Sequence, residues 1–366
     1  MTITRIGIVG AGTMGGGIAT ATAQAGVEVL LTDAKPGAAA AAVDLAGTFF
    51  ARSVEKGRLS QDEADAARQR MHVVGSIDAL ADVDLVIEAV FEDMALKTDV
   101  LAKIASAVRP DTLIGTNTSC LRVSELAKAV TQPERFLGLH YFSPAQVNPI
   151  VEVVRGEQTA DAAVALALEF TQRTGKQPLA CKDQWGFCIN RFFCPYTNEA
   201  ARLVDEGLGT PGEIDLVAKE AVGAAAGPFQ VMNIVKPRIN LHAIRNLAPL
   251  GAFYTPARSM AVTGDAETSW TIDPAGDIDP AKADLIRDRL RAGTFLPVLQ
   301  ELDEGVAGPA EIDHGAREAL KFGKPPCALM DRLGRAEVER LIVPLCSKYG
   351  YQLPKSLDRV GSLIST

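Results

Sequence analysis

Short apolar runs alternate with helical stretches through the first half of the chain. Runs rich in β-branched residues lie at 3–9, 27–32, 72–74, 84–89, 112–116, 135–140 and 150–154. Between them the pattern predicts helices, the first over 14–26 and the next in an Ala-rich, charged region that precedes residue 72. This alternation is typical of a parallel sheet built from strand–helix–strand units. We therefore predict an α/β N-terminal domain over residues 1–184, ending near a turn at Cys181–Lys182–Asp183.

The second half of the chain is predicted to be all-α and to contain an internal repeat. Asp205-Glu206-Gly207, followed by Glu213-Ile214-Asp215, recurs 98 residues later as Asp303-Glu304-Gly305 and Glu311-Ile312-Asp313. Self-similarity at a fixed offset is the signature of a duplicated structural unit. We predict two related helical modules, 185–285 and a degenerate second copy over 286–366.

A glycine-rich turn lies between the first predicted strand and the first predicted helix. Gly10, Gly12 and Gly15 form the pattern G-x-G-x-x-G, and Asp33 closes the second strand. In this context the glycines allow a tight turn and a close approach to a pyrophosphate, while the acid hydrogen-bonds a ribose 2′-hydroxyl. No arginine follows Asp33 to bind a 2′-phosphate, so the pattern favours NAD over NADP in a Rossmann-like domain. A tight turn with a surface aspartate is the alternative. The predicted cofactor contacts here are Gly10, Gly12, Thr13, Met14, Gly15 and Asp33.

Four polar residues at or near the ends of predicted elements are candidates for catalysis: Ser119, His140, Glu152 and Asn190. Glu152 shares a strand face with apolar residues, so its carboxylate needs a partner in the core. A histidine at the end of the neighbouring strand is such a partner, and the pair would act as a general base toward an alcohol. Structural roles stay open, as a helix N-cap for Ser119, a turn residue for His140 and a helix start for Asn190.

The composition narrows the class of partner. Acidic residues number 45 and basic residues 37, and a formal net charge of −8 argues against nucleic acid and anionic membranes as partners. No apolar run is long enough to span a membrane, and the first strand leaves no room for a signal peptide. The six cysteines are sparse and lack metal-type spacing, so we expect a cytoplasmic protein without a metal site.

At these motifs the sequence resembles the L-3-hydroxyacyl-CoA dehydrogenase family of fatty acid β-oxidation. The matching strings are GIVGAGTMGGGIA at 7–19, IEAVFED at 87–93, NTS at 117–119, GLHYFSP at 138–144, VEVV at 151–154 and CKDQWGFCINR at 181–191. The resemblance implies His140 as the base, Glu152 as its orienting carboxylate, and Ser119 and Asn190 as groups that position the substrate. Further cofactor contacts are implied for Glu92, Lys97, Asn117 and Ser143, the last at a position where the family usually has asparagine.

The resemblance implies reversible NAD-dependent oxidation of an L-3-hydroxyacyl-CoA to the 3-oxoacyl-CoA. Because CoA is a polyanion, we expect cationic contacts from Arg52 and Lys56, although a solvated helix face accounts for both residues nearly as well. Two alternatives remain: an NAD-dependent dehydrogenase of a free 3-hydroxy acid or sugar acid, and a non-catalytic NAD-binding protein.

The duplicated helical module resembles the dehydrogenase part of multifunctional β-oxidation proteins. We expect it to replace a contact between subunits, in a monomer or homodimer that takes an acyl-CoA substrate. Residues 246–270 depart from the family pattern.

Overall fold

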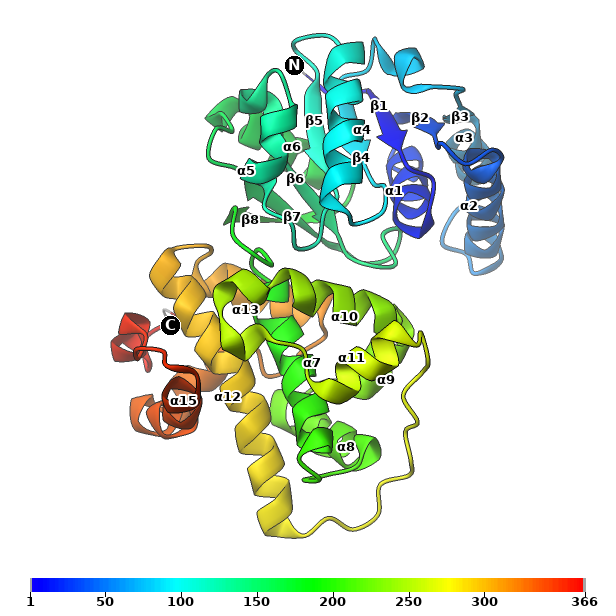
Figure 1. Ribbon diagram of the computed structural model, residues 1–366. Helices are drawn as coiled ribbons and strands as arrows, with labels where there is room; N and C mark the ends of the chain where they lie inside the picture. The colour runs from blue at the N-terminus through cyan, green and yellow to red at the C-terminus, as the bar shows by residue number, and fades with distance from the viewer. Residues whose placement is uncertain (1, 365–366) are drawn as a thin grey trace. The chain divides into compact units, whose positions relative to one another are not determined.

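The structure, a computed structural model, describes residues 2–364 and divides the chain into two compact units. Unit 1 ends at Asp183 and unit 2 begins at Gln184. Figure 1 shows a sheet with helices in unit 1 and helices alone in unit 2. The two units are described separately below.

Unit 1 contains an eight-stranded sheet in the order β3-β2-β1-β4-β5-β6-β7-β8. All neighbours pair in parallel except β6 and β7, which are antiparallel. The predicted α/β architecture is therefore confirmed. The strands are β1 (Arg5–Val9), β2 (Glu28–Thr32), β3 (Met71–Val73), β4 (Leu85–Glu88), β5 (Leu113–Thr116), β6 (Phe136–Tyr141), β7 (Ile150–Arg155) and β8 (Gln177–Lys182).

The strand β8 was not predicted, and the expected turn at Cys181–Lys182–Asp183 is wrong. Cys181 and Lys182 pair with Val154 and Arg155 of β7, so β8 runs to the end of unit 1. The strand contains Pro178, a residue that usually argues against a strand. Proline is tolerated here because β8 is the edge strand of the sheet.

The two faces of the sheet are covered by different helices. One face packs against α1 (Thr13–Gln24), α2 (Ala38–Glu55), α3 (Gln61–Gln69) and α6 (Asp161–Arg173) in a single apolar core. On the other face, Gly7 of β1 leaves space for Leu80 of the short helix η1 (Ile77–Leu80). That face also carries α4 (Met94–Ala107) and α5 (Val123–Leu126), which contact each other. The short helices η2 (Ala127–Ala129) and η3 (Pro133–Arg135) lead into β6.

Helices are the regular elements of unit 2 in its described residues, apart from one isolated β-bridge, as the sequence predicts. The long helix α12 is continuous across the predicted module boundary between 285 and 286, and the segment without helix before it lies at 266–279. The helices are α7 (Asn190–Asp205), α8 (Pro211–Val222), α9 (Pro228–Val235), α10 (Pro237–Asn246), η4 (Ala248–Leu250), η5 (Ala252–Tyr254), α11 (Arg258–Asp265), α12 (Pro280–Glu304), α13 (Pro309–Ala319), α14 (Pro326–Leu333), α15 (Arg335–Tyr349) and η6 (Lys355–Arg359).

Contacts in the two halves of unit 2 follow the 98-residue offset. The carboxylate of Asp215 on α8 accepts hydrogen bonds from the first N–H groups of α9, at Phe229 and Gln230. Its counterpart Asp313 on α13 accepts hydrogen bonds from the backbone N–H groups at 327 and 328, where α14 begins. A buried acid that caps the following helix is thus found at both copies of the repeated motif.

Other contacts join the two halves to each other at equivalent positions. Arg191 on α7 pairs with Glu304 on α12 at 2.5 Å, and Arg289 on α12 pairs with Glu206 after α7 at 2.8 Å. These four residues are related by the same offset, so each half supplies one arginine and one glutamate. The isolated β-bridge between Ala224 and Phe322 likewise joins equivalent residues. Reciprocal contacts of this kind are those of a two-fold interface.

The segment 246–270, which departs from the family pattern, belongs to the core of unit 2. Phe253 and Tyr254 are fully buried. The guanidinium of Arg202 on α7 donates hydrogen bonds to the carbonyl oxygens of Phe253 and Thr255 at 2.6 and 2.7 Å. These contacts fix the segment against α7.

Candidate active site

The glycine-rich turn has the geometry that an anion site requires. Gly10 has a φ of +103°, and a side chain there would collide with the carbonyl of Ala89. Gly15 lies so close to the Gly10 carbonyl that no Cβ could fit between them. A Cβ at Gly12, in contrast, would meet no atom within 4 Å, and Gly12 caps α1 without a side chain. The first turn of α1 therefore has open space at its N-terminus, as a pyrophosphate would need.

Asp33 follows β2 and lies beside this turn. Its Oδ2 accepts a hydrogen bond from the backbone N–H of Ala11 at 2.6 Å, and its Oδ1 accepts one from Lys35 N–H at 2.7 Å. The carboxylate is half-buried, so it supports the turn while keeping a solvent-facing side. Placed at the carboxyl end of β2, it is positioned as the acid that receives a ribose hydroxyl in dinucleotide-binding domains.

His140 and Glu152 lie opposite each other on the antiparallel strands β6 and β7. The imidazole Nδ1 is 2.6 Å from Glu152 Oε2, and both side chains are at least 95% buried. Their neighbours Leu139 and Val151 belong to the apolar core with α1 and α2, so the pair points to the opposite face of the sheet. Such a carboxylate fixes the imidazole tautomer with its proton on Nδ1 and leaves Nε2 as the base.

Ser119 lies in the loop after β5, and Glu92 holds that loop. Glu92 Oε1 accepts three hydrogen bonds, from Thr118 Oγ1 at 2.6 Å, Ser119 N–H at 2.8 Å and Cys120 N–H at 3.1 Å. Burial of Glu92 opposes its ionisation, but the charge of Lys97 and these three donors outweigh burial, so the pKa of Glu92 lies below its ordinary value. Glu92 is therefore an anion that fixes the backbone conformation at Ser119 through these hydrogen bonds.

Asn117 connects this loop to the strand of His140. Its side-chain oxygen accepts a hydrogen bond from Tyr141 N–H at 2.8 Å, beyond the point where β5 and β6 stop pairing. Asn117 is buried, whereas Ser143, two residues after β6, is exposed. The predicted cofactor contacts thus differ: Ser143 is accessible to a ligand, while one face of the Asn117 amide is used to hold the site together.

A buried lysine supports the loop that carries Ser143. Lys176 Nζ donates hydrogen bonds to the carbonyl oxygens of Ala145 and Asn148, at 2.6 and 2.8 Å. Burial lowers the pKa of this ammonium to about 8. Ala145 lies close to Gly17 of α1, so Lys176 also fixes the packing of the loop against the helix of the glycine-rich turn.

Replacement of this lysine should therefore destabilise unit 1. In Lys176→Met the two carbonyls lose their donor, and we expect the free energy of unfolding to fall by about 1–3 kcal/mol. Urea unfolding followed by circular dichroism measures the change. Lys182→Met, on the exposed side of β8, is the matched control and should stay within about 0.5 kcal/mol of wild type. Equal stability of the two variants would remove Lys176 from this role.

Three other predicted contacts lie in different surroundings. Lys97 is 1% exposed and pairs with Glu88 and Glu92, so it is covered by protein. Arg52 and Lys56 are exposed at the C-terminal end of α2, where both remain available to an anionic ligand. Asn190 is the first residue of α7 in unit 2. Its role toward the substrate stays a prediction.

Sequence reasoning did not identify Glu88, Thr116 or Lys176. Glu88 and Thr116 close the apolar strands β4 and β5 and are both fully buried. Both could have been identified as polar residues at the carboxyl ends of buried strands, where α/β sheets bind ligands. Lys176 had no comparable signal, because its acceptors are backbone atoms about 30 residues away in the chain.

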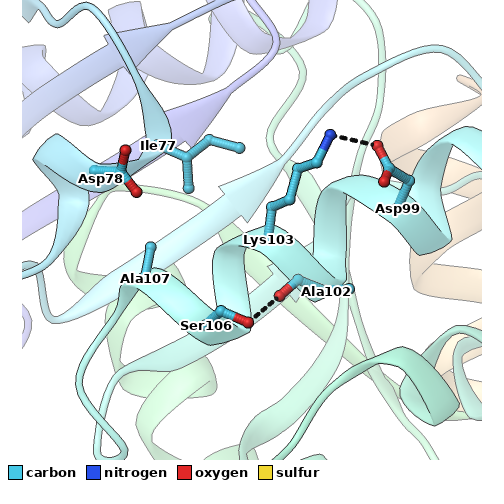
Figure 2. A pocket seen from close by; sticks show the side chains of 7 residues that line it. All are labelled: Ile77, Asp78, Asp99, Ala102, Lys103, Ser106 and Ala107. Carbon is cyan, nitrogen blue, oxygen red and sulfur yellow. Dashed lines mark hydrogen bonds and ion pairs between the residues drawn. The ribbon is translucent and has the colours of Figure 1, made fainter.

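A surface hollow of about 530 Å³ lies elsewhere in unit 1, between η1 and the second half of α4. Figure 2 shows Lys103 and Asp99 in an ion pair at its wall, with Asp78 on the opposite side. The hollow contains none of the predicted site residues. It lies toward the amino ends of the strands, whereas α/β sheets bind ligands at the carboxyl ends.

The structure contains neither a candidate metal site nor a candidate membrane span in the residues it describes. No group of three or more His, Cys, Asp or Glu side chains within 2–364 is arranged to hold a metal ion. Over the same range, none of the helices combines the length and apolar character needed to cross a membrane.

Comparison with known proteins places both units in one family. Residues 5–184 match the family described as "3-hydroxyacyl-CoA dehydrogenase, NAD binding domain", and residues 186–263 match "3-hydroxyacyl-CoA dehydrogenase, C-terminal domain". These matches confirm the family that the sequence motifs indicate, and NAD as its cofactor.

Individual relatives support the same assignment. The chain is 34% identical over 231 residues to a probable 3-hydroxybutyryl-CoA dehydrogenase of Deinococcus radiodurans, covering 63% of this chain and 83% of that protein. It is 36% identical over 238 residues to 3-hydroxyadipyl-CoA dehydrogenase of Escherichia coli, covering 65% of this chain but only 50% of the relative. The chain thus spans about half the length of that curated relative.

A solved structure resembles the whole chain. The crystal structure of 3-hydroxybutyryl-CoA dehydrogenase from Escherichia coli superposes with a TM-score of 0.87 at 24% identity, covering 99% of each chain. At this identity the likeness establishes the fold alone, and it includes both halves of unit 2.

Proposed function

The chain belongs to the 3-hydroxyacyl-CoA dehydrogenase family, and on that premise we propose that it oxidises an L-3-hydroxyacyl-CoA to the 3-oxoacyl-CoA with NAD. The observation that carries the proposal is the buried pair of His140 and Glu152, whose side chains are 2.6 Å apart. The pair lies toward the carboxyl end of β6, on the side of the sheet where the parallel strands β1, β4 and β5 also end. Burying a hydrogen-bonded histidine and carboxylate costs free energy, and the fold alone does not require the pair. Its presence at this position therefore supports a catalytic role.

The residues divide the work of the reaction. His140 Nε2 accepts the proton of the substrate hydroxyl, and Glu152 stabilises the imidazolium that forms. Ser119 donates a hydrogen bond to the reacting oxygen, and Asn190 contacts the thioester or the 3-oxygen. When bound, NAD supplies the acceptor for the hydride that leaves C3. Base assistance of this kind contributes roughly 10²–10⁴ in rate, and orientation much of the remainder.

The residues present fit the cofactor. The open space at Gly12 and the uncapped start of α1 suit the pyrophosphate, and Asp33 suits the adenosine ribose. Thr13, Met14 and Ser143 are proposed to line the remaining contact surface, together with Glu92 and Asn117 after β4 and β5. Lys97 on α4 is covered by protein, and we propose that it acts on the cofactor site through its ion pair with Glu92. No step of the proton transfer depends on these contacts.

The choice between NAD and NADP tests the role of Asp33. We expect wild type to prefer NAD by kcat/KM, because the carboxylate repels a 2′-phosphate, and Asp33→Ala to narrow that preference. Since Asp33 also supports the glycine-rich turn through Ala11, Asp33→Asn is the control that removes the charge but keeps an acceptor. Equal use of both cofactors by wild type would contradict the assignment.

The substrate class separates this proposal from its main alternative. Arg52 and Lys56 are cations that could bind the CoA group of the substrate. A free 3-hydroxy acid or sugar acid has no CoA group and would gain nothing from them. The experiment is to follow NADH oxidation with acetoacetyl-CoA and with free acetoacetate. Turnover of the CoA ester alone is the expected result. Preference for the free acid would favour the alternative enzyme, and inactivity with both would favour a non-catalytic NAD-binding protein.

The second half of unit 2 is proposed to take the place of a partner subunit. Its support is the reciprocal pairing of Arg191 with Glu304 and of Arg289 with Glu206. The predicted modules were 185–285 and 286–366; because α12 begins at Pro280, we propose 185–279 and 280–366 in their place. We further propose a chain that is active as a monomer, with a homodimer as the alternative. The cytoplasm is the proposed location, on the sparse cysteines of the sequence.

A further inference from the structure

A closed ring of polar contacts joins the ends of β4 and β5 to the loop of Ser119. Glu88 Oε1 accepts a hydrogen bond from Lys97 Nζ at 2.8 Å, and Glu88 Oε2 accepts one from Thr116 Oγ1 at 2.6 Å. Thr116 Oγ1 in turn accepts a hydrogen bond from Thr118 N–H at 3.3 Å. Thr118 Oγ1 donates to Glu92, whose other oxygen is 3.4 Å from Lys97 Nζ, and this contact closes the ring.

The ring is largely buried, and its parts come from β4, β5, α4 and the loops that follow the two strands. Glu88 and Thr116 are direct neighbours in the register of β4 and β5, and Lys97 reaches them from α4, which covers this face of the sheet. Glu88 Oε1 also accepts the N–H of Val90 at 2.7 Å. Every member is thus fixed by at least two contacts, so the ring is preorganised rather than assembled by a ligand.

The ring carries one negative charge in excess. It contains two carboxylates, Glu88 and Glu92, and one ammonium, Lys97, with side chains that are 0%, 19% and 1% exposed. Thr116 and Thr118 are neutral. In surroundings with little water, an uncompensated charge acts over a longer distance than it does at the surface.

The strand order indicates which half of a bound dinucleotide this charge would face. The start of α1, next to β1, would hold the pyrophosphate, and Asp33 at the end of β2 would accept a hydrogen bond from the adenosine ribose. Because β4 and β5 lie on the opposite side of β1 from β2, their carboxyl ends would hold the other half of a bound dinucleotide. That half is the nicotinamide, which is a cation when oxidised and neutral when reduced.

We propose that the ring of Glu88, Thr116, Thr118, Glu92 and Lys97 sets the preference of the site for oxidised over reduced nicotinamide, while it positions Ser119. The excess charge attracts NAD⁺ more strongly than NADH. The proposal rests on the proposed function only in that the chain binds NAD.

Two variants separate the charge of the ring from its shape. Glu88→Gln removes the excess charge and preserves the size of the side chain, while Thr116→Val removes both hydrogen bonds of the Thr116 hydroxyl and leaves the charge unchanged. Calorimetric titration of the full chain with NAD⁺ and with NADH, in the absence of acyl-CoA, gives both dissociation constants. We expect Glu88→Gln to weaken NAD⁺ binding by about threefold to tenfold relative to NADH. Thr116→Val should leave that ratio as in wild type.

The outcomes distinguish this inference from the proposed function. An unchanged ratio in Glu88→Gln, or the same shift in Thr116→Val, would overturn the inference while leaving NAD binding intact. Absence of binding to wild type would instead overturn the proposed function. If Glu88→Gln does not fold by circular dichroism, Glu92→Gln makes the same change of charge at a partly exposed side chain and should shift the ratio in the same direction.

Discussion

In a His140→Gln variant, kcat is expected to fall by a factor of about 10²–10⁴, while NADH binds as tightly as in wild type. Glutamine can hold the hydrogen bond to Glu152 but cannot accept the substrate proton. Because His140 is 4% exposed within β6, its replacement by a residue of similar size should leave the strand pairing intact. Steady-state kinetics with acetoacetyl-CoA give kcat, and calorimetry gives the affinity for NADH.

The matched control for this variant is His72→Gln. His72 lies on β3 with about half of its side chain exposed and contacts Glu28 only at the surface. Its turnover should equal that of wild type. If His140→Gln kept more than about a third of wild-type turnover, another group would have to be the base.

Removal of the second half of unit 2 is expected to abolish the solubility of the isolated chain or to make it dimerise. The cut belongs after residue 279, before α12, rather than at 285, which lies inside that helix. It would expose Phe193 and Tyr196 of α7, whose rings pack against Phe322 at 6.4 and 5.5 Å between centroids. It would also remove Arg289 from the buried carboxylate of Glu199, which would keep only its contact with Arg202. Exposed apolar surface favours association.

Size-exclusion chromatography with light scattering measures the outcome against the full chain at the same concentration. Aggregates, or a new dimer formed through α7, are the expected species of the truncated chain. A truncated chain that stayed soluble, monomeric and fully active would refute the role of the second half as a substitute for a partner subunit.

The sequence predicted the parts of the fold that depend on local pattern. β1, α1 and β2 follow from an apolar run, a glycine-rich turn and a second apolar run. The repeat followed from the motifs at 205–207 and 213–215, which recur 98 residues later. The burial problem of Glu152 pointed to a histidine on the neighbouring strand, and the two side chains are hydrogen-bonded in the structure.

What the sequence left open depends on contacts between distant residues. β8 contains a proline and shows only a weak alternation of apolar and polar residues, so its sequence does not indicate a strand. It forms because the free edge of β7 is available for pairing. The ring around Glu88 joins residues up to 30 positions apart, and no spacing along the chain reveals it. Ser119 was predicted as a site residue, but its anchoring by Glu92 follows only from the way the two loops meet.

The central claim, that this chain itself oxidises 3-hydroxyacyl-CoA, is tested most directly by one measurement. Purified full chain is mixed with L-3-hydroxybutyryl-CoA and NAD, NADH is followed by its absorbance, and the CoA product is identified by mass. We predict one molecule of acetoacetyl-CoA for each NADH formed, at a rate that His140→Gln lowers by the factor given above. Binding of NAD without formation of NADH from this substrate, or from a longer L-3-hydroxyacyl-CoA, would contradict the claim.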